Sequence, residues 1–291
     1  MKVIEALQKG RPTLSFEFFP PKTREQEGHL FTVLGELKGL NPDFASVTYG
    51  ALGTTREKTF YWVKEIKERF QIEPVAHLTC VAANRESIRQ QLEELATMKI
   101  ENILALRGDP PEGEERFIPP AEGFAYARDL VAFIKSRKPG FCLGVAGYPE
   151  GHREAPSLDR DTEYLKEKVG AGADYVITQL FFDNRFFFDF LARCDKAGIR
   201  VPIIPGIMPI TSLKQLKKMT DICGATIPEK LMERMEKASA DKKAIVQLGI
   251  EQAVSQCQEL LEAEVPGLHF FVMNQSGPIL GILSELRSFR R

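Results

Sequence analysis

Short runs of β-branched and aromatic residues alternate along the chain with longer, charged segments in which apolar residues recur every three or four positions. The runs predict β-strands, and the longer segments predict amphipathic α-helices. Eight strands are predicted in this way, at residues 13–19, 44–50, 74–80, 102–108, 142–148, 175–182, 201–207 and 268–274. The clearest helices are predicted at residues 55–70, 84–99 and 243–264, with extra helical sequence around residues 227–238. In the second of these helices, Asn84 is the expected N-cap, and Ser87, Leu92 and Leu95 share the predicted apolar face.

This alternation predicts a fold of the α/β class. Parallel strands need a crossover of about a dozen residues, which is the length of the helical segments. Eight strand and helix repeats within 291 residues favour a closed (β/α)8 barrel, the TIM barrel, over an open sheet. Because no linker, low-complexity stretch or change of composition interrupts the pattern, we expect a single domain over residues 1–291.

Composition narrows the class of protein. A formal net charge of −1, with 43% hydrophobic and 27% charged residues, is typical of a globular protein and gives no electrostatic case for nucleic acid or an acidic membrane surface. Residues 1–12 lack the apolar core of a secretory signal, and no apolar run approaches the roughly 20 residues of a membrane-spanning helix. The cysteines are odd in number and far apart, which favours reduced thiols and a cytoplasmic protein. No histidine or cysteine spacing predicts a metal site.

Polar residues gather where the predicted strands end. In a (β/α)8 barrel the catalytic groups lie at the carboxyl ends of the strands. All but the seventh of the predicted strands deliver polar groups there, namely Glu17; Thr48 and Tyr49; His77 and Thr79; Arg107 and Asp109; Tyr148, Glu150 and His152; Gln179; and Asn274 and Gln275. The pattern therefore predicts an enzyme with a polar, carboxylate-containing mouth.

Each of these residues also has a structural interpretation. Glu17 lies within the apolar run SFEFFPP, where a carboxylate is costly unless it is paired, protonated or functional, and Arg107 is the structural partner to consider. His77 fits a hydrogen-bonded core histidine equally well, and Asp109 could tie down its own turn. Gln179 is harder to explain structurally, because a buried amide needs several partners. The chain has no G-x-G-x-x-G fingerprint after a strand, so residue patterns alone name no cofactor and no reaction.

Seven motifs, in order along nearly the whole chain, resemble the methylenetetrahydrofolate reductase family. They are SFEFFPPK (15–22), SVTYGA (46–51), HLTC (77–80), LALRGDPP (104–111), YPEGH (148–152), GADYVITQLFFD (172–183) and IIPGIMPI (203–210). The resemblance is to the bacterial single-domain form, and it implies a (β/α)8 barrel that holds FAD. The implied reaction is reduction of 5,10-methylenetetrahydrofolate to 5-methyltetrahydrofolate, in a ping-pong cycle with NADH or NADPH as electron donor.

The resemblance also implies roles for individual residues. Glu17 matches the general acid of the family, and we expect its aromatic neighbours to raise its pKa toward the value that such a role needs. Asp109 matches an aspartate near the flavin and the pterin, and Gln179 a glutamine that binds the substrate. The positions that match FAD contacts are Thr48, His77, Arg107, Gly108, Asp109, Tyr148, His152, Asp161 and Lys168.

Three positions of the shared folate and nicotinamide pocket depart from some bacterial relatives. Phe271 stands in place of a tyrosine, Gln275 in place of an arginine, and Met219 in place of a stacking aromatic residue. These departures leave alternatives to NAD(P)H open. One is an electron-transfer partner subunit, such as an iron–sulfur protein, and another is a flavin- or folate-binding subunit with weak activity of its own. We also expect an oligomer.

Overall fold

The computed structural model describes residues 1–48, 56–110 and 117–286. Its strands form a closed parallel barrel in chain order, which confirms the predicted (β/α)8 architecture. The strands are β1 Thr13–Phe18, β2 Phe44–Val47, β3 Pro74–Thr79, β4 Asn102–Leu106, β5 Cys142–Gly147, β6 Tyr175–Leu180, β7 Ile203–Ile207 and β8 Gly267–Phe271. Tyr49 and residues 111–116, which lie in a Pro- and Gly-rich segment of the sequence after β4, are outside the described residues.

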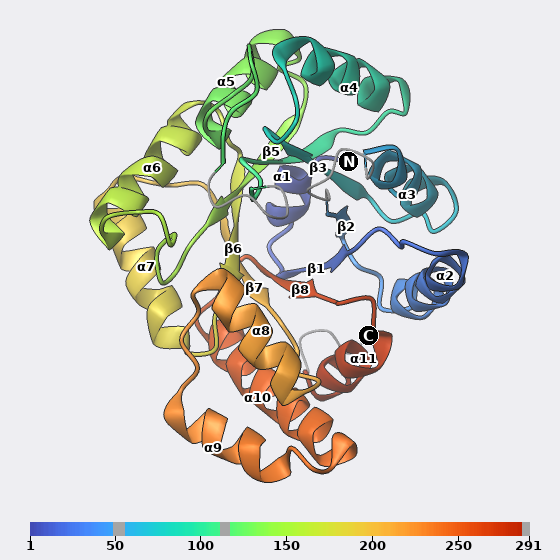
Figure 1. Cartoon of the computed structure of the whole chain (residues 1–291), viewed down its shortest axis with the longest axis vertical. Coiled ribbons are helices and arrows are strands. Elements are labelled where there is room, and N and C mark those ends of the chain that lie inside the picture. Colours follow the sequence, from blue (N-terminus) through green and yellow to red (C-terminus); the bar gives the residue numbers. More distant parts are fainter. Residues whose placement is uncertain (49–55, 111–116, 287–291) are drawn as a thin grey trace.

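Helices surround the strands. Figure 1 shows α2 to α7 following one another around the barrel, with α8, α9 and α10 grouped beside β7. The helices are α1 Val3–Leu7, α2 Arg24–Lys38, α3 Arg56–Glu68, α4 Arg85–Thr97, α5 Ala127–Arg137, α6 Leu158–Gly170, α7 Asn184–Lys196, α8 Leu213–Cys223, α9 Glu229–Ala238, α10 Lys242–Glu262 and α11 Ser276–Glu285. The extra helical sequence expected around residues 227–238 is α9, which packs against α10.

Helix α4 illustrates how the local sequence sets an element. The side chain of Asn84 accepts a hydrogen bond from the backbone N–H of Ser87 at 2.9 Å, which satisfies one of the amides left unpaired at a helix start. Ile88, Leu92 and Leu95 then bury one face of the helix against the barrel. Ser87, which we expected on that face, instead donates from its hydroxyl to the carbonyl of Asn84. The predicted cap is confirmed, and the predicted position of Ser87 is wrong by one residue.

The first helix closes the amino-terminal end of the barrel. Val3 on α1 donates its backbone N–H to Oδ1 of Asn102, the first residue of β4, at 2.8 Å. Its side chain packs in a buried cluster with Phe44 and Val75 near the starts of β2 and β3. The interior at this end is therefore filled, and a site must lie at the opposite end, where the strands finish.

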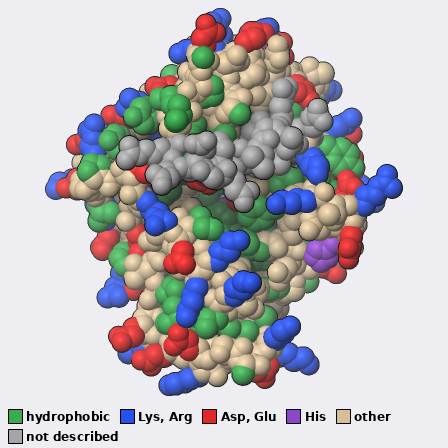
Figure 2. Space-filling model, viewed as in Figure 1, with side chains coloured by type: hydrophobic (Ala, Val, Ile, Leu, Met, Phe, Trp, Pro, Cys, Tyr) green, Lys and Arg blue, Asp and Glu red, His purple; other side chains and the backbone are tan. Residues whose placement is uncertain are grey.

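The surface of the protein has a hollow that combines apolar and basic side chains. In the space-filling view, hydrophobic side chains lie at the floor of a central hollow, and several Lys and Arg side chains gather below it (Figure 2). Such a combination is typical of a pocket that takes a partly apolar, anionic ligand. Among the described residues, no helix has both the length and the apolar composition needed to cross a membrane.

Candidate active site

The carboxyl ends of the strands enclose a cavity of about 190 Å³. Most of the residues that the sequence placed at strand ends line it together, although they come from strands far apart in the chain. They are Glu17 on β1, His77 on β3, Arg107, Gly108 and Asp109 after β4, Tyr148 and His152 after β5, Gln179 on β6 and Phe271 on β8. The barrel thus brings two carboxylates, two histidines, an arginine and an amide to one place.

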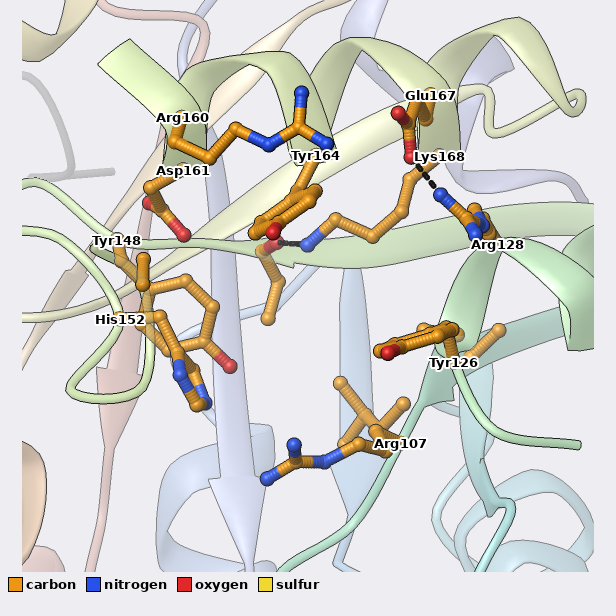
Figure 3. Close-up of a pocket in the computed structure, with 15 residues that line it drawn as sticks. Arg107, Tyr126, Arg128, Tyr148, His152, Arg160, Asp161, Tyr164, Glu167 and Lys168 are labelled. Atoms are coloured by element: carbon orange, nitrogen blue, oxygen red, sulfur yellow. Dashed lines mark hydrogen bonds and ion pairs between the residues drawn. The ribbon is translucent and has the colours of Figure 1, made fainter. Parts of the chain in front are cut away.

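A second cavity, of about 260 Å³, adjoins the first and shares the lining residues Arg107, Tyr148 and His152 with it. Asp161 and Lys168, both predicted cofactor contacts, line this cavity from α6. Figure 3 shows Tyr148 and His152 on one side and Tyr126 on the other, with Lys168 reaching in from the helix and Arg107 facing them. The two cavities together form one extended site.

Two predicted cofactor or substrate contacts are not among the residues that line either cavity, and neither are four of the predicted strand-end residues, namely Thr79, Glu150, Asn274 and Gln275. Thr48 follows β2, and its backbone carbonyl accepts a hydrogen bond from the hydroxyl of Thr59 at 3.0 Å. Met219 lies on α8, where it packs against a buried cluster that includes Leu216 and Met235. Their predicted roles therefore have no geometric support in this arrangement of the described residues.

Glu17 is nearly buried, with 7% of its surface exposed. Its polar side-chain contacts with described residues all end on Oε2. The hydroxyl of Ser46 donates to this oxygen at 3.3 Å, and the Nε2 atoms of His77 and His269 each lie 3.4 Å from it. Arg107 is not among these partners, because its guanidinium forms a two-pronged ion pair with Glu154. The interpretation of Glu17 as the structural partner of Arg107 is therefore wrong.

The electrostatics of Glu17 differ from the expectation. Burial raises the pKa of this carboxyl, as its apolar sequence context predicted, but the facing imidazoles of His77 and His269 lower it further than burial raises it. The pKa of Glu17 lies well below its ordinary value, so the resting side chain is ionised. The prediction of a raised pKa is wrong, because it considered the apolar neighbours in the sequence and not the histidines from β3 and β8.

His269 is a site residue that our reading of the sequence missed. It is completely buried on β8, and its Nδ1 lies 2.9 Å from the hydroxyl oxygen of Ser15 on β1. Ser15 and His269 are direct partners in the pairing of β1 with β8. A partial signal was present in β1, because Ser15 and Glu17 are two residues apart and their side chains therefore point to the same face of the strand, into the barrel. A polar residue of the neighbouring strand could be expected to contact them there.

The turn after β4 depends on a glycine. Gly108 has a φ of +87°, a conformation that residues with a side chain rarely adopt. A Cβ atom at this position would lie 2.6 Å from Cγ2 of Val81. Glycine therefore lets the turn pass close to the loop after β3, and it places Arg107 and Asp109 on the rim of the cavity.

The second cavity concentrates cations around a partly apolar space. Lys168 donates from Nζ to the backbone carbonyl of Ala146 at 2.5 Å, and Nζ lies 5.6 Å from the ring of Tyr148. Burial lowers the pKa of Lys168 to about 8, against the opposing effect of Asp161. Burial also raises the pKa of Asp161, against the opposing effect of Lys168. A buried cation at the wall of the cavity is suited to an anionic ligand.

His152 presents a defined hydrogen-bonding group to this space. Its Nδ1 accepts from the backbone N–H of Glu154 at 3.1 Å, so the neutral ring carries its proton on Nε2 and offers it as a donor. Burial lowers the pKa of His152, and the positive charge of Arg107 adds to this effect, so the ring is neutral near neutral pH. The edge of His152 packs against Tyr148, with 4.8 Å between the ring centres.

Several lining residues of the second cavity were not predicted. On α6, Arg160, Tyr164 and Glu167 share the face that carries Asp161 and Lys168, at the spacing of successive helical turns. Arg160 lies over the ring of Tyr164 at 4.7 Å, and Arg128 is paired with Glu167. These positions could have been predicted from the sequence, because they lie three or four residues from Asp161 or Lys168 or directly beside them on the same helix, and those two residues match cofactor contacts of the family.

The donor set fits FAD. Cations at Arg107 and Lys168 and the Nε2–H of His152 suit the two phosphates, and the rings of Tyr126 and Tyr148 suit flat heterocycles. Within the described part of the chain, no group of His, Cys, Asp and Glu side chains is arranged to hold a metal ion. All five cysteines are unpaired thiols.

The whole described barrel corresponds to one family of known proteins. The family model for methylenetetrahydrofolate reductase matches residues 2–287. A 5,10-methylenetetrahydrofolate reductase of Salmonella typhimurium is 39% identical over 268 residues, which cover 92% of this chain and 88% of that protein. The corresponding protein of Escherichia coli is 38% identical with the same coverage.

Longer relatives and solved structures complete the comparison. A probable methylenetetrahydrofolate reductase (NADH) of Oryza sativa is 38% identical over 98% of this chain, and the chain spans about half the length of this and other plant and fission-yeast relatives. An uncharacterised protein from Clostridium thermocellum that binds two copies of 5-methyl-5,6,7,8-tetrahydrofolic acid superimposes with a TM-score of 0.64 at 18% identity, over 97% of this chain and 96% of that one. At this identity the likeness shows a shared fold.

Proposed function

The chain belongs to the methylenetetrahydrofolate reductase family, and from this premise we propose that it reduces 5,10-methylenetetrahydrofolate to 5-methyltetrahydrofolate with FAD as its redox cofactor. The observation that carries the proposal is the convergence of Glu17, Asp109 and Gln179 on one cavity at the carboxyl ends of the barrel strands. These are the acid, the pterin partner and the amide that the family resemblance implies. Five unpaired thiols support a cytoplasmic location.

FAD would lie across the two adjoining cavities. Arg107 and Lys168 would bind its phosphates, His152 would donate from Nε2, and Tyr148 would pack against a ring. When bound, FAD supplies a two-electron carrier that accepts hydride equivalents from a donor and passes them to the folate. The protein's contribution is to bind and orient the two reactants and to control a proton beside them.

Glu17 would perform the acid step. Opening of the imidazolidine ring of the substrate needs one proton on a ring nitrogen, and the product of opening is an iminium carbon that can accept hydride. Glu17 lies in the cavity with the exposed carboxylate of Asp109 and the half-buried amide of Gln179. Those two groups would hold the polar edge of the pterin, because a carboxylate accepts from its N–H groups and an amide can both donate and accept.

The proposed electron donor is NADH or NADPH. Phe271 lines the cavity beside Glu17 and offers an aromatic surface to a nicotinamide or pterin ring. The edge of Phe271 also packs against His269, with 5.5 Å between ring centres, which fixes its position at the end of β8. A partner subunit that delivers electrons is the alternative, and kinetics separates the two.

The test is an anaerobic stopped-flow experiment on the FAD-loaded protein, monitored at the absorbance band of oxidised flavin. NADH, NADPH and 5-methyltetrahydrofolate are mixed with the protein separately. Bleaching by 5-methyltetrahydrofolate and by one nucleotide is the expected result, and it names the donor. Bleaching by 5-methyltetrahydrofolate alone would favour a partner subunit as donor, and no bleaching by 5-methyltetrahydrofolate would overturn the proposed folate chemistry.

A further inference from the structure

The loop between β5 and α6 carries two side chains that we assign to the binding of FAD. Tyr148 and His152 of this loop line both cavities (Figure 3). The N–H of Gly151 donates to the carbonyl of Tyr148 at 3.0 Å. The N–H of Ala155 donates to the carbonyl of His152 at 2.8 Å. Both bonds lie within the loop, so they set its local shape, and its position on the barrel depends on contacts with other elements.

Glu150 and Arg153 fasten the other side of this loop to α8 and to the segment after it. Both carboxylate oxygens of Glu150 accept from the backbone N–H of Thr226, at 3.1 and 2.9 Å. Nη1 of Arg153 donates to the carbonyl of Asp221 and, at 3.3 Å, to that of Ile222, in the last turn of α8. A guanidinium suits these carbonyls, because the end of a helix leaves them without partners in the helix and carries a partial negative charge. We call the two contacts together the α8 clamp.

The end of α8 is shaped to receive Arg153. Gly224 caps the helix in the left-handed region, with a φ of +75° and its N–H bonded to the carbonyl of Thr220 at 2.8 Å. A Cβ atom at Gly224 would lie 3.1 Å from Cγ of Arg153, so glycine allows both the cap and the close passage of the arginine. The charge of Asp109, on the rim of the cavity, adds to burial in raising the pKa of Cys223 to about 11. The last residue of α8 therefore lies near that rim.

Arg193 supports the loop from a third element. Its Nη2 donates from α7 to the backbone carbonyl of Pro149 at 2.8 Å, next to Glu150 in the chain. Glu150 itself is half-buried, and burial raises the pKa of its carboxyl while Thr226 lowers it. A carboxylate that loses part of its hydration needs a directed partner, and Thr226 is the partner that Glu150 has within the described structure.

We propose that Glu150 and Arg153 are positioning residues of the cofactor site: they clamp the loop to the end of α8 and thereby aim its two cofactor groups into the cavities. This inference rests on the proposed binding of FAD. The clamp also lets FAD displace Glu154 without moving the loop, because the neighbouring residue stays fastened to α8 while the carboxylate leaves Arg107. The end of α8 lines neither cavity in the described part of the chain, yet it helps to determine the affinity for FAD.

The binding test measures the Kd for FAD of the apoprotein by quenching of flavin fluorescence. We expect Glu150→Ala to raise this Kd by about tenfold, because a hydrogen bond to a charged group contributes about that factor. Glu150→Gln keeps an oxygen that accepts from Thr226, so its Kd should stay within about threefold of the wild-type value. Arg153→Ala changes an exposed side chain, which the fold tolerates, and should raise the Kd by about threefold.

The matched control is Asp241→Ala. Asp241 also accepts from two backbone N–H groups, those of Lys243 and Ala244 at the start of α10, and it is not among the residues that line the two described cavities. This variant should lower the urea midpoint of unfolding, as Glu150→Ala does, and leave the Kd for FAD unchanged. A role in stability alone would affect the two variants alike, so an equal rise of the Kd in Asp241→Ala would overturn the inference.

Two further outcomes separate the inference from the proposed function. Wild-type affinity for FAD in both Glu150→Ala and Arg153→Ala would overturn the inference. A wild-type apoprotein that does not bind FAD would overturn the proposed cofactor instead.

Hydrogen exchange gives a second readout, away from the cavities. Coupling between two sites is reciprocal, so a clamp that tightens FAD binding by about tenfold is itself stabilised by FAD by the same factor. FAD should therefore slow the exchange of the N–H of Thr226, followed by mass spectrometry of a peptide that covers residues 221–226. The effect should disappear in Glu150→Ala at saturating FAD. Exchange in the wild-type peptide that does not respond to FAD would overturn the inference.

Discussion

Arg107 and Glu154 form a two-pronged ion pair at the junction of the two cavities, with Nη1 of Arg107 2.5 Å from Oε2 and Nη2 2.7 Å from Oε1 of the carboxylate. Both Nη atoms of the guanidinium are used in this pair. A phosphate bound at Arg107 needs the same nitrogens, since a guanidinium binds a carboxylate and a phosphate with one geometry. Glu154 therefore competes for the same donors of Arg107 that we assign to an anionic group of FAD.

Glu154→Gln should bind FAD more tightly than the wild-type protein. FAD must displace the carboxylate of Glu154, which is 57% exposed, and an ion pair this exposed contributes about 1 kcal/mol or less. Removing it should therefore lower the Kd for FAD by about twofold to fivefold. Quenching of flavin fluorescence on titration of the apoprotein measures this change.

A matched control for this variant is Glu86→Gln. Glu86 is paired with Arg89 on the exposed face of α4, and Arg89, unlike Arg107, lines neither cavity of the site. We expect its Kd for FAD to equal that of the wild-type protein. Weaker FAD binding by Glu154→Gln would show that Glu154 orients Arg107 for the cofactor and does not compete with it.

Lys168 should make FAD binding depend on pH. Burial lowers the pKa of Lys168 to about 8 in the protein without cofactor, and a bound phosphate would raise it again. Binding above pH 8 then requires uptake of a proton, so the Kd for FAD should rise with pH by up to about tenfold per unit. Titrations of the apoprotein with FAD at a series of pH values give this slope.

His152 and Tyr148, which line the same cavity as Lys168, keep their charge state between about pH 7 and about pH 9. Burial lowers the pKa of His152 and raises that of Tyr148, so the first is neutral and the second protonated near pH 8. Lys168→Arg, which keeps its charge, should abolish the pH dependence while retaining most of the affinity. A slope that persists in Lys168→Arg would assign the dependence to a different group.

Glu17→Gln should separate the two halves of the reaction. The amide is the same size as the carboxyl group, so FAD binding and flavin reduction by a nucleotide should stay within about twofold of the wild-type values. Folate reduction loses its acid and should slow by about 10²- to 10⁴-fold. Stopped-flow traces of each half-reaction measure both effects in one preparation, and full folate turnover by this variant would remove Glu17 from the acid role.

The barrel could be predicted because its strands are buried on both faces. A strand such as Pro74–Thr79 is buried at every position, so it reads as a continuous apolar run between charged helices. Polar residues interrupt these runs where the strands end, which located Glu17, Arg107 and Gln179 correctly around one cavity. Local patterns were sufficient for these features, because each depends on its own strand.

Features that depend on distant parts of the chain could not be predicted in the same way. The contact of Ser15 with His269 forms where the last strand closes on the first, 254 positions apart in the sequence. The pKa of Glu17 is lowered by His269, which the closure of the barrel brings beside it, and by His77 on a third strand. Glu154 reaches Arg107 from a loop whose path no local period determines, and the packing of Met219 on the cluster around Leu216 and Met235 depends on how α8 and α9 meet.

Gly108→Ala should destabilise the protein and weaken its cofactor site together. At a φ of +87°, a residue with a Cβ costs about 1–2 kcal/mol, and the atom would also lie 2.6 Å from Val81 and 3.2 Å from Thr79. We therefore expect a loss of about 2 kcal/mol or more in the free energy of unfolding, measured with urea, and a higher Kd for FAD.

The matched control is Gly140→Ala, since a Cβ at Gly140 meets no atom within 4 Å. Its free energy of unfolding should change by no more than about 0.5 kcal/mol, and its affinity for FAD should not change. The two effects of Gly108→Ala share one cause, because the turn that needs glycine is the turn that carries Arg107 and Asp109. A Gly108→Ala protein as stable as the control, with wild-type FAD affinity, would show that the turn relaxes without moving these residues.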